Sequence, residues 1–169
     1  MRGAAVLVLG LWMGLLVASW AVATASFRTV DRVLGPGGSP ELQERLAPLA
    51  PDVRRAVLRH VASESNRWMF GAMSIAELAL GLALVAVSWR LGPVPRALAL
   101  AALLAVVLQA SALGPAILRL GRSIDFVPRP LPPAEGRRFG LLHAAYMLAD
   151  LVKAAVLGAA AWVIVRRGP

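Results

Sequence analysis

Four long apolar runs alternate with arginine-rich segments along the chain, and this pattern predicts four helices that cross a membrane. The runs cover residues 3–27, 68–89, 97–118 and 139–165. At a rise of about 1.5 Å per residue, each is long enough to cross a hydrocarbon core of about 30 Å. We therefore predict an all-α integral membrane protein, with residues 1–169 forming a single membrane domain in which four transmembrane helices make a bundle.

The first run also has features of a cleavable signal peptide. Arg2 gives it a positive start, and Ala23-Thr24-Ala25 matches a small-x-small cleavage site. Because the run is longer than the ~7 to 15 apolar residues usual in signal peptides, we predict that it is retained as the first span.

The first connection, residues 28–67, holds seven arginines and five acidic residues and has helix signals of its own. Ser39 can cap a helix and Pro40 suits its first turn, which predicts a short helix to about Leu49. After Pro51, valines recur every four residues and share one face of a helix, and the arginines lie outside that face. This pattern predicts an amphipathic interfacial helix leading into the second span. We interpret those arginines as a solvated face in preference to a specific lipid site.

Two shorter segments predict how the later helices are connected. The tight turn at 90–96 makes the second and third spans antiparallel neighbours, and Gly114-Pro115 predicts a kink or an early end of the third span. The loop at 119–138 contains four prolines and is predicted to be extended. Four spans place both termini on one face. Twelve arginines in the two long connections, against five elsewhere, favour a cytoplasmic location for those connections, although Arg2 favours the opposite orientation.

The composition supports a membrane as the protein's solvent. Of 169 residues, 59% are hydrophobic and 16% are charged, and the mean hydropathy is +0.70, too apolar for one soluble core of this size. The absence of cysteine excludes disulfides and thiolate metal sites. The net charge of +9 comes from arginines between apolar runs, which indicates contact with lipid headgroups or a role in membrane topology, and no nucleic-acid partner. We expect a multi-pass protein of the cell (plasma or inner) membrane.

Polar residues interrupt the last apolar run at spacings of three, four and three: His143, Tyr146, Asp150 and Lys153. At about 100° per residue, these side chains share one stripe of a helix. Glu77 lies near the middle of the second span, at a similar depth. Because charged groups are costly inside a bilayer and usually mark a partner or a path, we predict a buried polar cluster of these five residues.

Lys153 is the base of this cluster, and we predict that a carboxylate holds it. Asp150 is three residues away on the same helix, whereas Glu77 can reach Lys153 only if the second and fourth spans are neighbours. Two acids and one base give a net charge of −1 when all are ionised, so we expect one carboxyl to be protonated, which is the arrangement that a proton-coupled carrier needs. An inert buried cluster that fixes helix packing would look the same.

We favour the structural interpretation, a non-catalytic bundle that assembles with itself or with a membrane partner. The alternative is a small-solute, proton-coupled or soft-metal transporter or resistance protein. A soft-metal site would use Met69, Met73, Met147 and His143, which suit Cu(I), but such methionines are usually packing residues. A haem held by His60 and His143 ranks below it. No cofactor is predicted, and because no catalytic motif is present we predict that the protein is not an enzyme.

Short motifs resemble a family of four-span membrane proteins of unknown function that includes transmembrane protein 205. They are Gly10-Leu-Trp-Met-Gly14, Val22-Ala-Thr-Ala-Ser-Phe27, Leu113-Gly-Pro115 with Leu118, and Phe139-Gly-Leu-Leu-His143. The resemblance covers most of the chain, but Asp150 and Lys153 depart from the family pattern and the first connection is longer. The resemblance implies a membrane bundle without agreed catalytic residues. It also implies a loose association with drug or metal-drug resistance, which belongs to the family's animal member. The first motif is also a GxxxG pattern, which we expect to pack inside the bundle.

Overall fold

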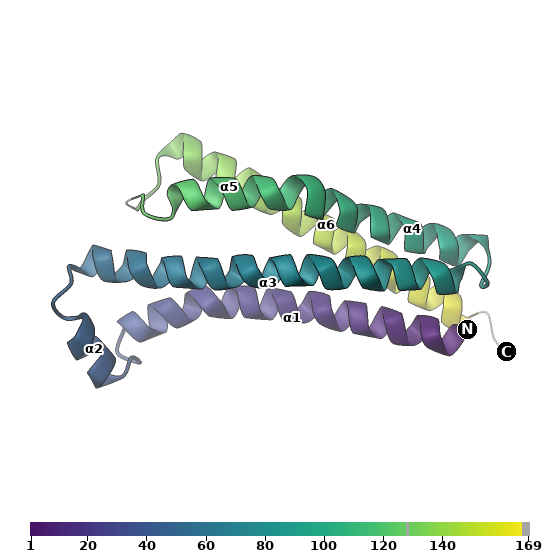
Figure 1. Cartoon of the computed structure of the whole chain (residues 1–169), viewed down its shortest axis with the longest axis horizontal. Coiled ribbons are helices and arrows are strands. Elements are labelled where there is room, and N and C mark those ends of the chain that lie inside the picture. The colour runs from purple at the N-terminus through teal and green to yellow at the C-terminus, as the bar shows by residue number, and fades with distance from the viewer. Residues whose placement is uncertain (128, 167–169) are drawn as a thin grey trace.

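The computed structural model describes residues 1–127 and 129–166, and these fold into helices joined by short connections (Figure 1). In chain order the elements are α1 (Arg2–Leu34), α2 (Pro40–Leu46), α3 (Pro51–Ser88), α4 (Pro93–Leu108), a π-helical turn (Gln109–Leu113), α5 (Gly114–Ile124) and α6 (Pro133–Arg166). Four helices, with α4 to α5 counted as one, are long and apolar enough to cross a membrane. The predicted class, an all-α membrane bundle with four spans, is confirmed.

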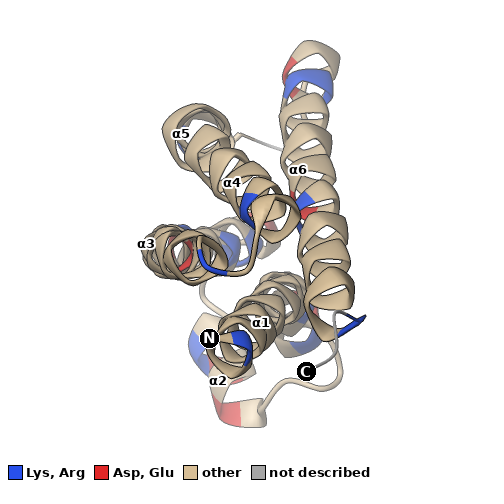
Figure 2. Cartoon of the chain, turned by 90° about the vertical axis from the view of Figure 1, so that its right-hand side faces the viewer, with Lys and Arg blue, Asp and Glu red and all other residues tan. Residues whose placement is uncertain are grey.

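The four long helices stand at the corners of the bundle, so that each packs against two others (Figure 2). α1 contacts α3 and α6, and α4 contacts the same two helices. α3 and α6 are therefore diagonal to each other. Figure 1 shows that α1 begins and α6 ends at one end of the bundle, here called the terminal end. The opposite end, which carries α2 and the loop between α5 and α6, is called the long-connection end.

The helices extend farther into the first connection than hydropathy predicts. α1 continues past Phe27 to Leu34 and stops where Gly35 and Pro36 follow, because proline cannot continue the helical hydrogen bonds. α3 is continuous from Pro51 to Ser88, so the helix predicted after Pro51 leads into the second span without a break. No proline lies between these two ends of α3, and nothing interrupts its backbone.

α2 confirms the predicted short helix in the first connection. Ser39 Oγ accepts a hydrogen bond from the Leu42 amide at 3.3 Å, and Pro40 occupies the first turn. At the other end, Arg54 donates to the carbonyls of Leu49 at 2.6 Å and Ala47 at 2.8 Å. A cation is favourable beside these last carbonyls, which explains where α2 ends.

The prediction of an extended segment over 119–138 is wrong at both of its ends. α5 continues to Ile124, and α6 already begins at Pro133, since proline is well suited to a first helical turn. Pro128, which contributed to the prediction, lies outside the described residues. Of the two alternatives predicted at Gly114-Pro115, a kink or an early end, the early end is not seen, because the π-helical turn before Gly114 carries the helix across the missing proline N–H.

The apolar core lies nearer the terminal end, around Trp12. The indole of Trp12 is fully buried, and Gly81 of α3 makes this close packing fit. A Cβ at Gly81 would lie 2.8 Å from Leu103 Cδ1 and 3.1 Å from the Trp12 ring. Gly10 and Gly14, in contrast, would meet nothing within 4 Å. The prediction that this GxxxG pair packs inside the bundle is wrong, because Trp12 takes the inward position and the glycines lie off that face of α1.

Candidate functional site

Lys153 is the centre of a buried hydrogen-bonded network. Its side chain is 1% exposed, and its ammonium lies near three acceptors from different parts of the bundle. Nζ is 2.7 Å from Glu77 Oε2, 2.8 Å from Gln109 Oε1 and 3.0 Å from Asp150 Oδ1. Nζ donates hydrogen bonds to Glu77 and Gln109, and Asp150 pairs with the ammonium as a second carboxylate.

Asp150 is the main acceptor of this network, because both of its carboxylate oxygens are used. Oδ1 accepts from Gln109 Nε2 at 2.8 Å in addition to its contact with Lys153, and Oδ2 accepts from Trp20 Nε1 at 3.1 Å. Gln109 Nε2 also lies 3.3 Å from the backbone carbonyl of Tyr146. Trp20, Glu77, Gln109, Asp150 and Lys153 are hereafter called the Lys153 network.

The Lys153 network draws one member or more from each long helix. Trp20 comes from α1, Glu77 from α3, Gln109 from the π-helical turn after α4, and the remaining two from α6. The prediction that Glu77 needs neighbouring helices to reach Lys153 is wrong. α3 and α6 are diagonal, and the long lysine side chain crosses the core between them. A π-helical turn re-aims side chains within an α-helix, and here it begins at the network glutamine.

The charges of the network decide what it can do. Two carboxylates and one ammonium give a net charge of −1, and all three side chains are buried. Leaving any one of them unpaired in a low-dielectric core is costly, whereas a complete set of hydrogen bonds offsets much of the desolvation. The network therefore links α6 to α3 and to the π-helical turn through Lys153, and to α1 through the Trp20–Asp150 bond, which restricts how the four helices pack.

The structure brings Glu77, Asp150 and Lys153 together. The side chains of the other two predicted residues, Tyr146 and His143, have different contacts. The Tyr146 ring instead packs edge-on to Phe70, with centroids 6.0 Å apart. His143 is exposed and stacks on Phe139. The single polar stripe expected on the last helix is thus divided, because only its deeper half faces the core.

The candidate soft-metal set of Met69, Met73, Met147 and His143 stays a prediction. Met69, Met73 and Met147 are half-buried, and the interactions of His143 include no methionine sulfur. His60 lies at the long-connection end, beside Asp125 and Phe126, and it does not meet His143. The predicted copper and haem alternatives therefore gain no geometric support.

Sequence reasoning did not place Trp20 or Gln109 in the site. Gln109 carried a usable signal, since it is an amide within an otherwise uncharged apolar run. Trp20 carried none, because an indole in an apolar helix suits packing, an interface or a hydrogen bond equally well.

A second polar cluster, which the sequence analysis missed, joins α3 to the end of α5. Arg67 donates to Asp125 Oδ1 at 2.7 Å and also to Glu64, and His60 Nδ1 lies 2.9 Å from Asp125 Oδ2. Burial raises the pKa of Asp125, but the hydrogen bonds with Arg67 and His60 outweigh burial and hold that pKa below its usual range.

This second cluster contains metal-ligating groups. Ligand atoms of His60, Glu64 and Asp125 all lie within 4.8 Å of one another. Arg67, however, already bonds both carboxylates, so a cation at this place would have to displace a guanidinium. We therefore interpret the cluster as an ion-pair contact between helices.

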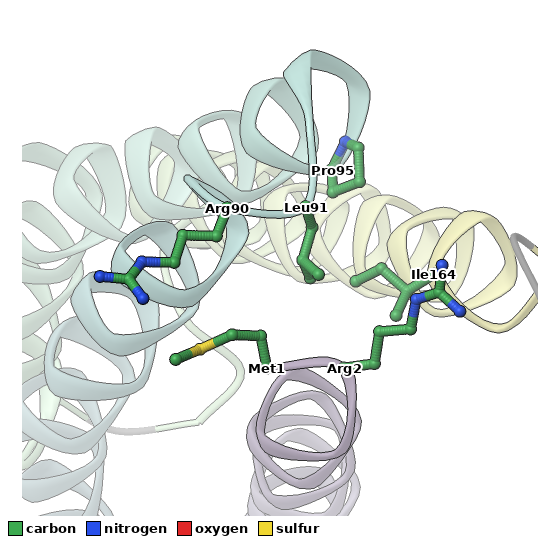
Figure 3. A pocket seen from close by; sticks show the side chains of 6 residues that line it. All are labelled: Met1, Arg2, Arg90, Leu91, Pro95 and Ile164. Atoms are coloured by element: carbon green, nitrogen blue, oxygen red, sulfur yellow. The ribbon is translucent and has the colours of Figure 1, made fainter. Parts of the chain in front are cut away.

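The charged residues of the Lys153 network line neither of two cavities at the surface of the bundle. One, of about 310 Å³, opens at the terminal end beside Met1, Arg90 and Pro95 (Figure 3). The other, of about 700 Å³, is an open groove along one face of α1, and all of its lining residues, Trp20 among them, belong to that helix. The groove therefore reaches the network only at the indole.

Comparisons with family models, curated proteins and solved structures gave no match to this chain. The fold and the two polar clusters therefore define the class of protein, a multi-pass helical membrane protein with a buried ion-pair network.

Proposed function

We propose that this protein is a non-catalytic membrane bundle in which the Lys153 network sets the packing of the four helices. The observation that carries the proposal is the enclosure of Lys153, which donates hydrogen bonds to α3 and the π-helical turn and forms ion pairs with Glu77 and Asp150. A carrier needs a group that exchanges protons or solute with water. Neither cavity that we describe is lined by Glu77, Asp150 or Lys153, which supports the structural role over the carrier.

The experiment that tests this role is a pH-flux assay in sealed proteoliposomes. We expect wild type, Glu77→Gln and Lys153→Met to dissipate a pH gradient no faster than empty liposomes. A protonophore added at the end verifies that the vesicles are sealed. Rapid flux through wild type that Glu77→Gln abolishes would overturn the structural proposal in favour of a proton-coupled carrier.

We also propose that the bundle assembles with itself through the outward face of α1 near its start. Gly10 and Gly14 have open space beside them, and a pair of glycines at this spacing lets two membrane helices approach closely. The chain has no cysteine, so single cysteines can be introduced and labelled without background.

Fluorescence energy transfer between labelled copies in vesicles tests this assembly. We expect Gly10→Ile to abolish transfer, while Gly158→Ile on α6, where a side chain also meets open space, leaves it unchanged. Wild-type protein without transfer at any protein-to-lipid ratio would refute self-assembly. Membership in the four-span family that includes transmembrane protein 205 is likewise a proposal, supported by the short motifs quoted above.

A further inference from the structure

The groove along α1 has the dimensions of one membrane leaflet. Its lining residues run from Val17 to Arg32 on one side of the helix. At about 1.5 Å per residue this is about 22 Å of helix, which matches half of a bilayer of about 40 to 45 Å with its headgroups. The groove therefore extends from the long-connection end to the depth of the Lys153 network.

The two ends of the groove differ in chemistry. Ala21 and Ala25 are small and leave room along the middle, and Val17 with the Trp20 ring gives an apolar deep end. Trp20 is held in place by its hydrogen bond to Asp150. A long apolar chain fits this part of the groove, because burying its methylene groups against apolar side chains is favourable.

The outer end of the groove is positively charged. Arg28 and Arg32 are four residues apart on one helix face, and both are exposed. The acid between them, Asp31, is paired with Arg55 at 2.9 Å. Among the described residues, neither Arg28 nor Arg32 has an ion pair, so two guanidinium groups are available to an anion at headgroup level.

We propose that this groove binds one anionic phospholipid. Arg28 and Arg32 hold its phosphate, and an acyl chain lies along Ala21 toward Trp20. Charge decides between a lipid and a second copy of the chain. A symmetric parallel dimer packed along the groove would bring four of these guanidinium groups together, and like charges repel. A second copy that crosses at Gly10 and Gly14 diverges from the groove, because such crossings are at about 40°.

Native mass spectrometry of the detergent-purified full chain tests the proposal. The probes are phosphatidylglycerol, phosphatidylcholine with the same acyl chains, and inorganic phosphate. We expect one phosphatidylglycerol per chain, at least tenfold tighter than phosphatidylcholine, and no competition from inorganic phosphate. Arg28→Gln with Arg32→Gln should lower phosphatidylglycerol affinity about tenfold, to the level of phosphatidylcholine.

Two further variants separate a built site from general surface charge. Arg45→Gln with Arg119→Gln removes the same charge from other exposed positions and should leave the lipid affinity unchanged. Ala21→Trp fills the groove and should weaken phosphatidylglycerol binding with both groove arginines intact. Equal loss in the control pair, full binding by Ala21→Trp, or saturation by inorganic phosphate alone would overturn the proposal. These outcomes are independent of the pH-flux assay.

Discussion

Replacing the two carboxylates of the Lys153 network by amides should have unequal effects on stability. In Asp150, Oδ1 accepts a hydrogen bond from Gln109 and pairs with the Lys153 ammonium, and Oδ2 accepts a hydrogen bond from Trp20. An asparagine at this position must point its NH₂ group at one of these donors in either orientation. Glu77 accepts from Lys153 through Oε2 alone among the described contacts, so glutamine can keep its oxygen toward the ammonium.

The size of the difference follows from the number of bonds that are affected. Interhelical hydrogen bonds in membranes are worth about 0.6 kcal/mol on average, and at most about 1.7 kcal/mol. Asp150→Asn weakens or breaks two of them, weakens the ion pair with Lys153 on the same helix and creates a donor-to-donor contact, so we expect a loss of about 2–4 kcal/mol. Glu77→Gln weakens one, and we expect about 1 kcal/mol. At roughly 2–4 °C per kcal/mol, the Tm should fall by roughly 10 °C and 3 °C, respectively.

Thermal unfolding in detergent, followed by circular dichroism, measures both variants under the same conditions. Glu44→Gln on α2, where the side chain is exposed, is the control for loss of one negative charge and should leave the Tm unchanged. Equal losses in the two variants, or a larger loss for Glu77→Gln, would refute the hydrogen-bond assignment of the network.

Three other outcomes are expected from the structure. Gly81→Leu should lower the Tm by several degrees in detergent because its side chain meets the core at once, whereas Gly71→Leu on the same helix, with open space beside it, should not; equal effects would contradict the packing. The hydrogen bonds of Asp125 depress its folded-state pKa, so they stabilise the fold above about pH 4 and are lost as the pH falls through the lowered pKa. The Tm gap between wild type and Asp125→Asn, equivalent to about 2 kcal/mol at pH 7, should therefore close on acidification, and a gap that persists at pH 2 would refute this. Reporter fusions at Gly37 and Pro169 should lie on opposite faces of the membrane, with Gly37 cytoplasmic. Reporters on the same face would refute the four-span topology.

The fold class could be predicted from hydropathy because lipid tolerates only helices with satisfied backbones in a chain of this composition. The ends of the helices could not be predicted in this way. Hydropathy records where a helix suits lipid, whereas the backbone stops only where its hydrogen bonds are interrupted. α1 therefore runs past Arg28 to the Gly35-Pro36 break, and α3 includes the whole segment after Pro51.

Part of the Lys153 network could likewise be predicted. Helical spacing places Asp150 beside Lys153, and equal depth brings Glu77 within range. The diagonal placement of α3 and α6 could not be predicted from the sequence. Short loops indicate which consecutive helices are neighbours, but they do not indicate how non-consecutive helices are placed. His143 was included in the predicted cluster because of its helical spacing alone. Its spacing fits the stripe, but it lies at a level where that face of α6 is exposed.

The coupling between Glu77 and Lys153 across the diagonal of the bundle tests the central claim most directly. A double-mutant cycle measures it from unfolding of wild type, Glu77→Gln, Lys153→Met and the double variant. Lys153→Met alone leaves two carboxylates without their ammonium and should cost roughly 3–5 kcal/mol. Adding Glu77→Gln to that variant should recover at least about 1 kcal/mol, because one unpaired charge is removed. Strictly additive losses would contradict the account, since the two side chains would then contribute to stability independently.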